Sequence, residues 1–224
     1  MAIDNHPKVR QAKALKRRKE TRQSYKSILI VCEGAKTEPL YLNEIRTQYR
    51  LASSNVQILP SALGTEPAQI VDYAEQLFRS GDPAKGIHPK SFDLVFVVFD
   101  RDSHLTYHQA LAKAAALNRK LRTEDGERVQ FSAVVSVPCF ELWLLLHFQN
   151  VQAPMQRGAV YQALKQHLPD YDKGQGGHWQ LTQHLLQVAT ERAQACALLT
   201  NAHNGVEPYT DMHQLVATLT QLRK

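Results

Sequence analysis

Three acidic residues stand at the ends of the two most apolar stretches of this sequence. Glu33 comes directly after Ile28–Cys32, and Asp100 and Asp102 follow the apolar run that begins at Phe92. Continuous runs of Ile, Val, Leu and Phe are typical of strands that are buried on both faces of a parallel sheet. A carboxylate at the tip of such a strand is costly to bury unless a positive charge compensates it. The three acids are therefore candidates for a shared chemical role.

That role is predicted to be the binding of a divalent metal ion. In an open α/β sheet, sites form beyond the carboxyl ends of the strands, so Glu33, Asp100 and Asp102 are expected at one edge. Asp100 and Asp102 face the same side if the strand continues through both. Carboxylates gathered at one edge repel each other unless a cation lies among them, and their oxygens select Mg²⁺ or Mn²⁺ over zinc. The alternative, that each acid caps a nearby helix, explains one acid better than three.

A fourth acid, Glu141, lies in the apolar segment "SVPCFELWLLLHF", just after a further predicted strand. An acid among apolar neighbours is costly to bury without a partner. Glu141 is therefore predicted either as a further metal ligand at the same edge or as part of a helix-capping arrangement. Of these two roles, the metal ligand is the one we expect.

Gly34 follows Glu33 directly and predicts a sharp turn at the end of the strand. A missing side chain would also let the backbone approach a phosphate closely. The segment is no P-loop, because the pattern GxxxxGK[ST] is absent, so nucleotide hydrolysis by this chain is not expected.

Elements that could position the acids follow from hydrophobic periodicity. Strands are predicted at Ile28–Cys32, Val56–Leu59, Phe92–Asp100 and Val129–Val137. Helices are predicted at Thr37–Gln48, Glu66–Arg79, Tyr107–Leu121 and Phe140–Phe148. Strands that alternate with helices indicate an α/β fold with a mainly parallel sheet, whose strands all end at one edge. We expect three parts: a basic arm (1–26), an α/β catalytic domain (27–150) and a wholly helical extension packed on the core (151–224).

The charge of the chain is concentrated in the basic arm. Residues 1–26 contain nine lysine and arginine residues against two acids, a net +7, whereas the rest of the chain carries −1. A basic arm on a near-neutral body suits nucleic acid, because neutralised phosphates release counterions. A solvated helix and an organelle-targeting peptide are the alternatives. Candidate nucleic-acid-binding residues are Lys16, Arg17, Arg18 and Lys19 in the arm, with Lys36, His104 and Lys173 further along.

The cysteines and the lack of long apolar runs predict a cytoplasmic protein with no membrane partner. Cys32, Cys139 and Cys196 are far apart and form no CxxC pair, which argues against a disulfide framework or a thiolate zinc site. No apolar run approaches the ~18 residues that a membrane helix needs. Residues 1–10 lack the apolar core of a secretory signal.

The acidic motifs resemble those of a known domain. "VCEGAKTE" and "VFDRDSH" are similar to the Toprim pattern, in which a strand-end glutamate and glycine precede a strand ending in DxD. "ILIVCEGAKTEPLYL" and "SVPCFELWLLLHF" resemble RloB-like proteins nearly throughout. The likeness covers about residues 25–150, with a weaker echo at Glu207–Val216. There the family tends to have Asn-Pro-Ser-Thr, whereas this chain has Glu-Pro-Tyr-Thr.

This resemblance implies a Toprim-like fold and a metal-dependent nuclease. Glu33 would act as general acid and base, and Asp100 and Asp102 would hold Mg²⁺. RloB-like proteins occur in restriction and phage-defence loci, and several are paired with an AAA-type ATPase in abortive-infection modules. A second hypothesis is a non-catalytic nucleic-acid-binding subunit of such an ATPase complex. The acids favour catalysis, because a pure binding module has no need of carboxylates that repel phosphate.

Overall fold

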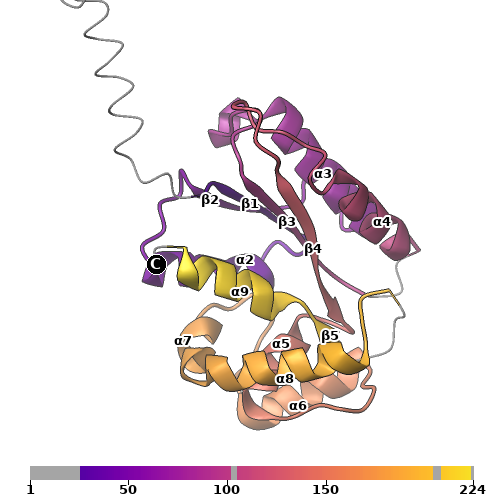
Figure 1. Cartoon of the computed structure of the whole chain (residues 1–224). Helices are drawn as coiled ribbons and strands as arrows, with labels where there is room; N and C mark the ends of the chain where they lie inside the picture. Colours follow the sequence, from indigo (N-terminus) through magenta and orange to yellow (C-terminus); the bar gives the residue numbers. More distant parts are fainter. Residues whose placement is uncertain (1–25, 102–104, 204–207, 223–224) are drawn as a thin grey trace, which may run out of the picture.

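The computed structural model of the chain describes residues 26–101, 105–203 and 208–222. The described residues form a five-stranded sheet in the order β2-β1-β3-β4-β5 (Figure 1). Its strands are β1 (Ile28–Cys32), β2 (Val56–Pro60), β3 (Leu94–Asp100), β4 (Gln130–Val137) and β5 (Tyr209–Thr210). The first four strands are parallel, and β5 runs antiparallel to β4. The prediction of an α/β fold with a mainly parallel, Toprim-like sheet is confirmed.

Helices cover both faces of the sheet (Figure 1). They are α2 (Thr37–Gln48), α3 (Pro67–Ser80), α4 (Tyr107–Leu117), α5 (Glu141–Phe148), α6 (Arg157–His167), α7 (His178–Thr182), α8 (Leu186–Leu199) and α9 (Met212–Gln221), with short 3₁₀ turns η1 (Pro83–Lys85) and η2 (Gln183–Leu185). Helix α4 ends four residues before the predicted bound, because the chain turns at Arg119, whose φ is +60°. Throughout the described ranges, the helices are too short or too polar to cross a membrane.

Side chains of β1 alternate between two apolar cores. Ile28, Ile30 and Cys32 pack with α2, α5, α8 and α9, whereas Leu29 and Val31 pack with α3 and α4. All five residues of β1 are fully buried, which confirms a strand covered on both faces. The same alternation in β3 places Asp100 on the face of Phe96 and Val98, toward α2 and α5.

The C-terminal part is not wholly helical, which corrects the prediction for 151–224. β5 extends the sheet, with Thr210 paired to Ser136 of β4 and the two hydroxyl oxygens 2.9 Å apart. A strand of two residues is too short to show the alternation by which strands are recognised in sequence. Val160 and Leu164 of α6 and Leu215 of α9 belong to the same apolar core as Ile30 of β1, with α9 packed against β4 and α6 against α5.

The strand order creates a crevice between β1 and β3. From β1 the chain passes through α2 to β2 on one side, and then crosses by α3 to β3 on the other side of β1. Open α/β sheets bind ligands at such a point, beyond the carboxyl ends of the two strands that diverge. Glu33 directly follows β1 and Asp100 ends β3, so both residues lie at this crevice.

Candidate active site

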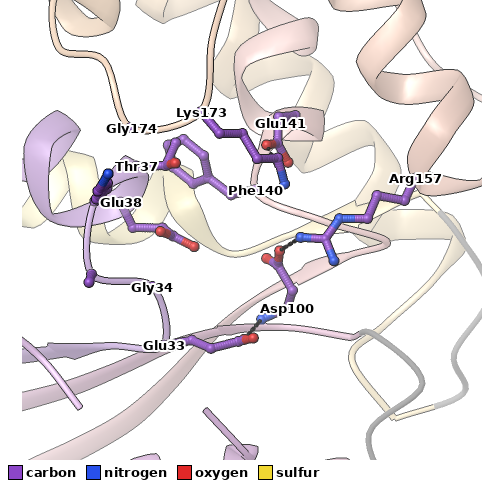
Figure 2. A pocket seen from close by; sticks show the side chains of 12 residues that line it. Glu33, Gly34, Thr37, Glu38, Asp100, Phe140, Glu141, Arg157, Lys173 and Gly174 are labelled. Atoms are coloured by element: carbon purple, nitrogen blue, oxygen red, sulfur yellow. Dashed lines mark hydrogen bonds and ion pairs between the residues drawn. The ribbon is translucent and has the colours of Figure 1, made fainter. Parts of the chain in front are cut away.

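A cavity of about 360 Å³ opens at this edge of the sheet. Figure 2 shows side chains from the sheet edge, α2, α5 and α6 turned toward it, with the loop before α7 lying over one side. Among the described residues, its charged lining consists of four acids (Glu33, Glu38, Asp100 and Glu141) and three cations (Lys36, Arg157 and Lys173). The structure thus brings together three of the four predicted metal ligands and two of the predicted nucleic-acid-binding residues.

Glu33 is held across the gap between β1 and β3. Its backbone N–H donates to the Val98 carbonyl at 2.8 Å, and its Oε2 accepts the Asp100 N–H at 3.0 Å. These two hydrogen bonds join the end of β1 to β3 and fix the direction of the Glu33 carboxylate. The position of Glu33 therefore depends on the register between two strands that lie far apart in sequence.

Asp100 is a buried acid with a cation beside it. Only 5% of the residue is exposed, and its Oδ2 lies 3.4 Å from Nη2 of Arg157. Burial raises the pKa of Asp100 well above its usual range, and the negative charges of Glu38, Glu33 and Glu141 raise it further. The Arg157 guanidinium opposes this shift. Asp100 therefore sits in an excess of negative charge that Arg157 only partly offsets.

Glu141 opens α5 and is 2% exposed. Its Oε1 accepts a hydrogen bond from the Tyr171 hydroxyl at 3.0 Å and lies 3.0 Å from Nζ of Lys173. Burial alone raises the pKa of Glu141, but the charge of Lys173 and the hydrogen bonds from Lys173 and Cys139 bring it below the usual value. A carboxylate held in its charged form therefore lines the cavity.

Glu38 also lines the cavity, although its place at the start of a predicted helix indicated a role in stabilising the helix dipole more than in binding a second metal ion. It lies in the first turn of α2 and is 8% exposed. A Cβ on Gly34 would stand 2.5 Å from its Oε2, so the missing side chain of Gly34 leaves room for this carboxylate. Burial raises the pKa of Glu38, and repulsion from Glu33 and Glu141 adds to the shift.

The loop before α7 is fixed on α2, and this brings Lys173 to the cavity. Glu44 of α2 accepts the N–H groups of Gly177 at 2.5 Å and Trp179 at 3.0 Å. Gly174 has a φ of +87°, and its Cβ position would be 2.7 Å from Cδ of Lys36, so the aliphatic part of Lys36 packs against the bare glycine. The loop thus closes one side of the cavity and places a lysine over Glu141.

The donor chemistry of the cavity fits a Mg²⁺ or Mn²⁺ ion. Its acids offer only hard oxygen ligands, and the raised pKa values of Asp100 and Glu38 reflect burial together with unbalanced negative charge. Within the described ranges, no three Asp, Glu, His or Cys side chains are already arranged to hold an ion. The predicted ligand Asp102 lies outside those ranges.

Several other predicted residues also fall outside the described ranges, namely His104 and the arm residues Lys16, Arg17, Arg18 and Lys19. Conversely, the structure shows two residues at the acids of the cavity, Arg157 and Tyr171, that no sequence motif predicted. Each contacts an acid far away in sequence, Asp100 and Glu141 respectively. Local spacing carries no signal for such contacts.

Comparison with known proteins identifies the family. No curated protein and no solved structure matches the chain significantly. The family model described as "RloB-like protein" matches residues 28–219, from β1 to α9. This match also covers residues 151–206, which lie between the two parts of the sequence that carry the resemblance. The chain therefore belongs to the RloB-like protein family.

Proposed function

We propose that this protein is a metal-dependent nuclease that hydrolyses phosphodiester bonds in DNA or RNA. The observation that carries the proposal is the convergence of four carboxylates on one cavity at the switch point of the sheet, with Asp100 and Glu141 almost completely buried. Buried acids that repel one another are unfavourable for folding alone. Their arrangement is explained if they hold a cation and act on a substrate.

The cations around these acids support a phosphate-containing substrate. Lys36, Arg157 and Lys173 line the same cavity as the acids. A phosphodiester needs both kinds of group, because its charge is compensated by cations while acids hold a metal ion and transfer protons.

Glu33 is the residue best placed for proton transfer. The Asp100 N–H donates to its Oε2, so a backbone group of the neighbouring strand orients the carboxylate. In the reaction, Glu33 accepts a proton from the attacking water or returns one to the leaving oxygen. Glu33, Asp100, Asp102 and Glu141 are the residues that would hold the ion. Mg²⁺ would supply polarisation of the scissile phosphate and stabilisation of its developing charge.

The resemblance to RloB-like proteins also supports a proposal about the biological setting. We propose a phage-defence role, as the effector of an abortive-infection system that acts with an AAA-type ATPase. This part of the proposal is supported by the resemblance of the motifs to RloB-like proteins and by the family match.

The direct test is a cleavage assay with the purified chain, alone and together with any AAA-type ATPase encoded beside its gene. We expect single- or double-stranded DNA or RNA to be cut with Mg²⁺ or Mn²⁺, and cleavage to stop when EDTA removes the ion. Intact substrates of all four kinds, with the ATPase and either metal present, would contradict the proposal.

A non-catalytic nucleic-acid-binding subunit of an ATPase complex is the second candidate. The nine basic residues within 1–26 favour it, since they suit phosphate contacts and such contacts need no catalytic acid. Cleavage in the assay above decides against it, and tight binding without cleavage under every condition decides for it.

The basic arm provides a prediction under either function. Removing residues 1–24 should weaken nucleic-acid binding and flatten the dependence of log K on log salt, by about 0.7–0.9 for each phosphate that the arm neutralises. Changing Lys16, Arg17, Arg18 and Lys19 together to glutamine should reproduce part of this effect. Lys85→Gln, in η1 before β3, is the control. Fluorescence anisotropy over a range of salt concentrations measures the slope. An unchanged slope after the deletion shows that the arm has another role.

A further inference from the structure

Two cations reach the acidic cavity from the C-terminal part of the chain. Arg157 is the first residue of α6, and Lys173 lies in the loop between α6 and α7. Each pairs with one acid of the sheet domain, Arg157 with Asp100 and Lys173 with Glu141. Figure 2 shows both side chains extending over these acids.

Within each of the two ion pairs, the cation is much more exposed than the acid. The side chains of Arg157 and Lys173 are 43% and 45% exposed, whereas those of Asp100 and Glu141 are 7% and 3% exposed. The acids are confined by packing, while the long side chains of the cations keep part of their length on the open side of the cavity. The cations can therefore move away from the acids more easily than the acids can move away from them.

The geometry of the contacts is compatible with an exchange of partners. Nη2 of Arg157 is 3.4 Å from Asp100 Oδ2, longer than the about 2.7–2.9 Å of a strong charge-assisted hydrogen bond. Glu141 keeps the hydrogen bond from the Tyr171 hydroxyl if Lys173 leaves. A divalent ion on these carboxylates would compete with both cations for the same oxygens, and repulsion between positive charges would favour their release.

We propose that Arg157 and Lys173 change partners when a metal ion binds: they pair with Asp100 and Glu141 in the metal-free protein and bind non-bridging phosphodiester oxygens once the ion holds the acids. The proposal deepens the nuclease function and depends on it for the identity of the substrate. The planar guanidinium of Arg157 suits two phosphate oxygens at once, and Lys173 supplies a mobile point charge. Metal ion and nucleic acid then strengthen each other's binding by the same factor, as linkage requires.

The test measures binding and not cleavage. Isothermal titration calorimetry gives the affinity for Mg²⁺ without nucleic acid. Fluorescence anisotropy gives the affinity for labelled single-stranded DNA and RNA oligonucleotides in Mg²⁺ and in EDTA, with their integrity checked on a gel. The variants are Arg157→Gln and Lys173→Met. Lys165→Met, which removes an exposed charge from α6 outside the lining of the cavity, is the matched control.

In the variants, the affinity for Mg²⁺ should rise, whereas the affinity for the oligonucleotide in Mg²⁺ should fall. In the wild type, Mg²⁺ should tighten oligonucleotide binding by about fivefold or more, within the usual range of coupling between sites. Each variant should bind Mg²⁺ more tightly than the wild type, because a competing cation is gone, and should lose most of the coupling. Lys173→Arg, which keeps the charge, should retain the coupling, and Lys165→Met should behave as the wild type.

Two results would overturn the proposal. If the variants bind both Mg²⁺ and oligonucleotide more weakly, the ion pairs only support the structure. If Mg²⁺ binds more tightly and coupling stays unchanged, the two cations are counterions and do not contact the phosphate. Failure of the nuclease function is separate: coupling without cleavage contradicts catalysis alone, whereas cleavage with coupling intact in both variants contradicts the exchange of partners alone.

Discussion

Glu33→Gln should lower phosphodiester cleavage by about 10²–10⁴-fold, the usual scale for loss of a general acid or base. The amide oxygen of glutamine can still accept the Asp100 N–H that Glu33 Oε2 accepts at 3.0 Å. Shape and anchoring are therefore preserved, while the group that takes up and returns the proton is removed. Folding should change little, and Mg²⁺ affinity should fall less than in Asp100→Asn, because the main role proposed for Glu33 is proton transfer and the glutamine amide oxygen can still act as a ligand beside Asp100, Asp102 and Glu141.

Single-turnover cleavage at saturating Mg²⁺ measures this loss without interference from product release. Glu124→Gln, which removes an exposed acid from the loop before β4, controls for the change in charge. Thermal unfolding and calorimetry with Mg²⁺ confirm that the variant remains folded and binds the ion. Equal cleavage by Glu33→Gln and wild type would remove Glu33 from the chemistry.

Asp100→Asn should weaken Mg²⁺ binding at least as much as loss of a supporting partner does, which is about 10–100-fold. An amide supplies one neutral oxygen where the carboxylate supplies two charged ones, so the main attraction for the ion disappears. High Mg²⁺ or Mn²⁺ should restore part of the cleavage. Calorimetry checks the affinity, with Asp125→Asn, an exposed acid, as control. An unchanged affinity would exclude Asp100 as a ligand.

The same variant should be more stable than the wild type when EDTA removes metal ions. Burial raises the pKa of Asp100 in the folded protein above that in the unfolded chain, so the folded state binds more protons. The free energy of unfolding of the wild type should thus fall as pH rises above the unfolded pKa of about 3.9, until the folded pKa is passed. Asparagine does not ionise and avoids this loss. The variant also gives up the attraction between the Asp100 carboxylate and Arg157, which limits the gain.

Urea unfolding at several pH values in EDTA measures this difference. The advantage of Asp100→Asn should be smallest near pH 4 and grow toward neutral pH. Asp125→Asn should track the wild type across the range. The result would contradict this prediction if the difference in free energy of unfolding between Asp100→Asn and the wild type became smaller as pH rises. The neighbours of Asp100 would then stabilise its carboxylate form more than burial destabilises it.

The sequence by itself determined the strands and helices that position the site. Ile28–Cys32 is a fully buried strand and Thr37–Gln48 is a helix with the predicted bounds. Continuous apolar runs and helical periodicity are local features, which a linear pattern expresses directly. Because parallel strands end at one edge, the pattern also placed Glu33 and Asp100 close together, and the structure joins them by a hydrogen bond.

Only the tertiary structure decided how the charges of the cavity are balanced. Arg157 lies 57 residues from Asp100, and Tyr171 lies 30 residues from Glu141, yet each pair is in contact. Glu38 faces the cavity because Gly34 leaves space for its carboxylate, a close approach that no spacing rule anticipates. β5 likewise becomes a strand by pairing with β4 and not by its own two-residue pattern. Such contacts arise when distant segments pack together, so neither spacing nor periodicity along the chain encodes them.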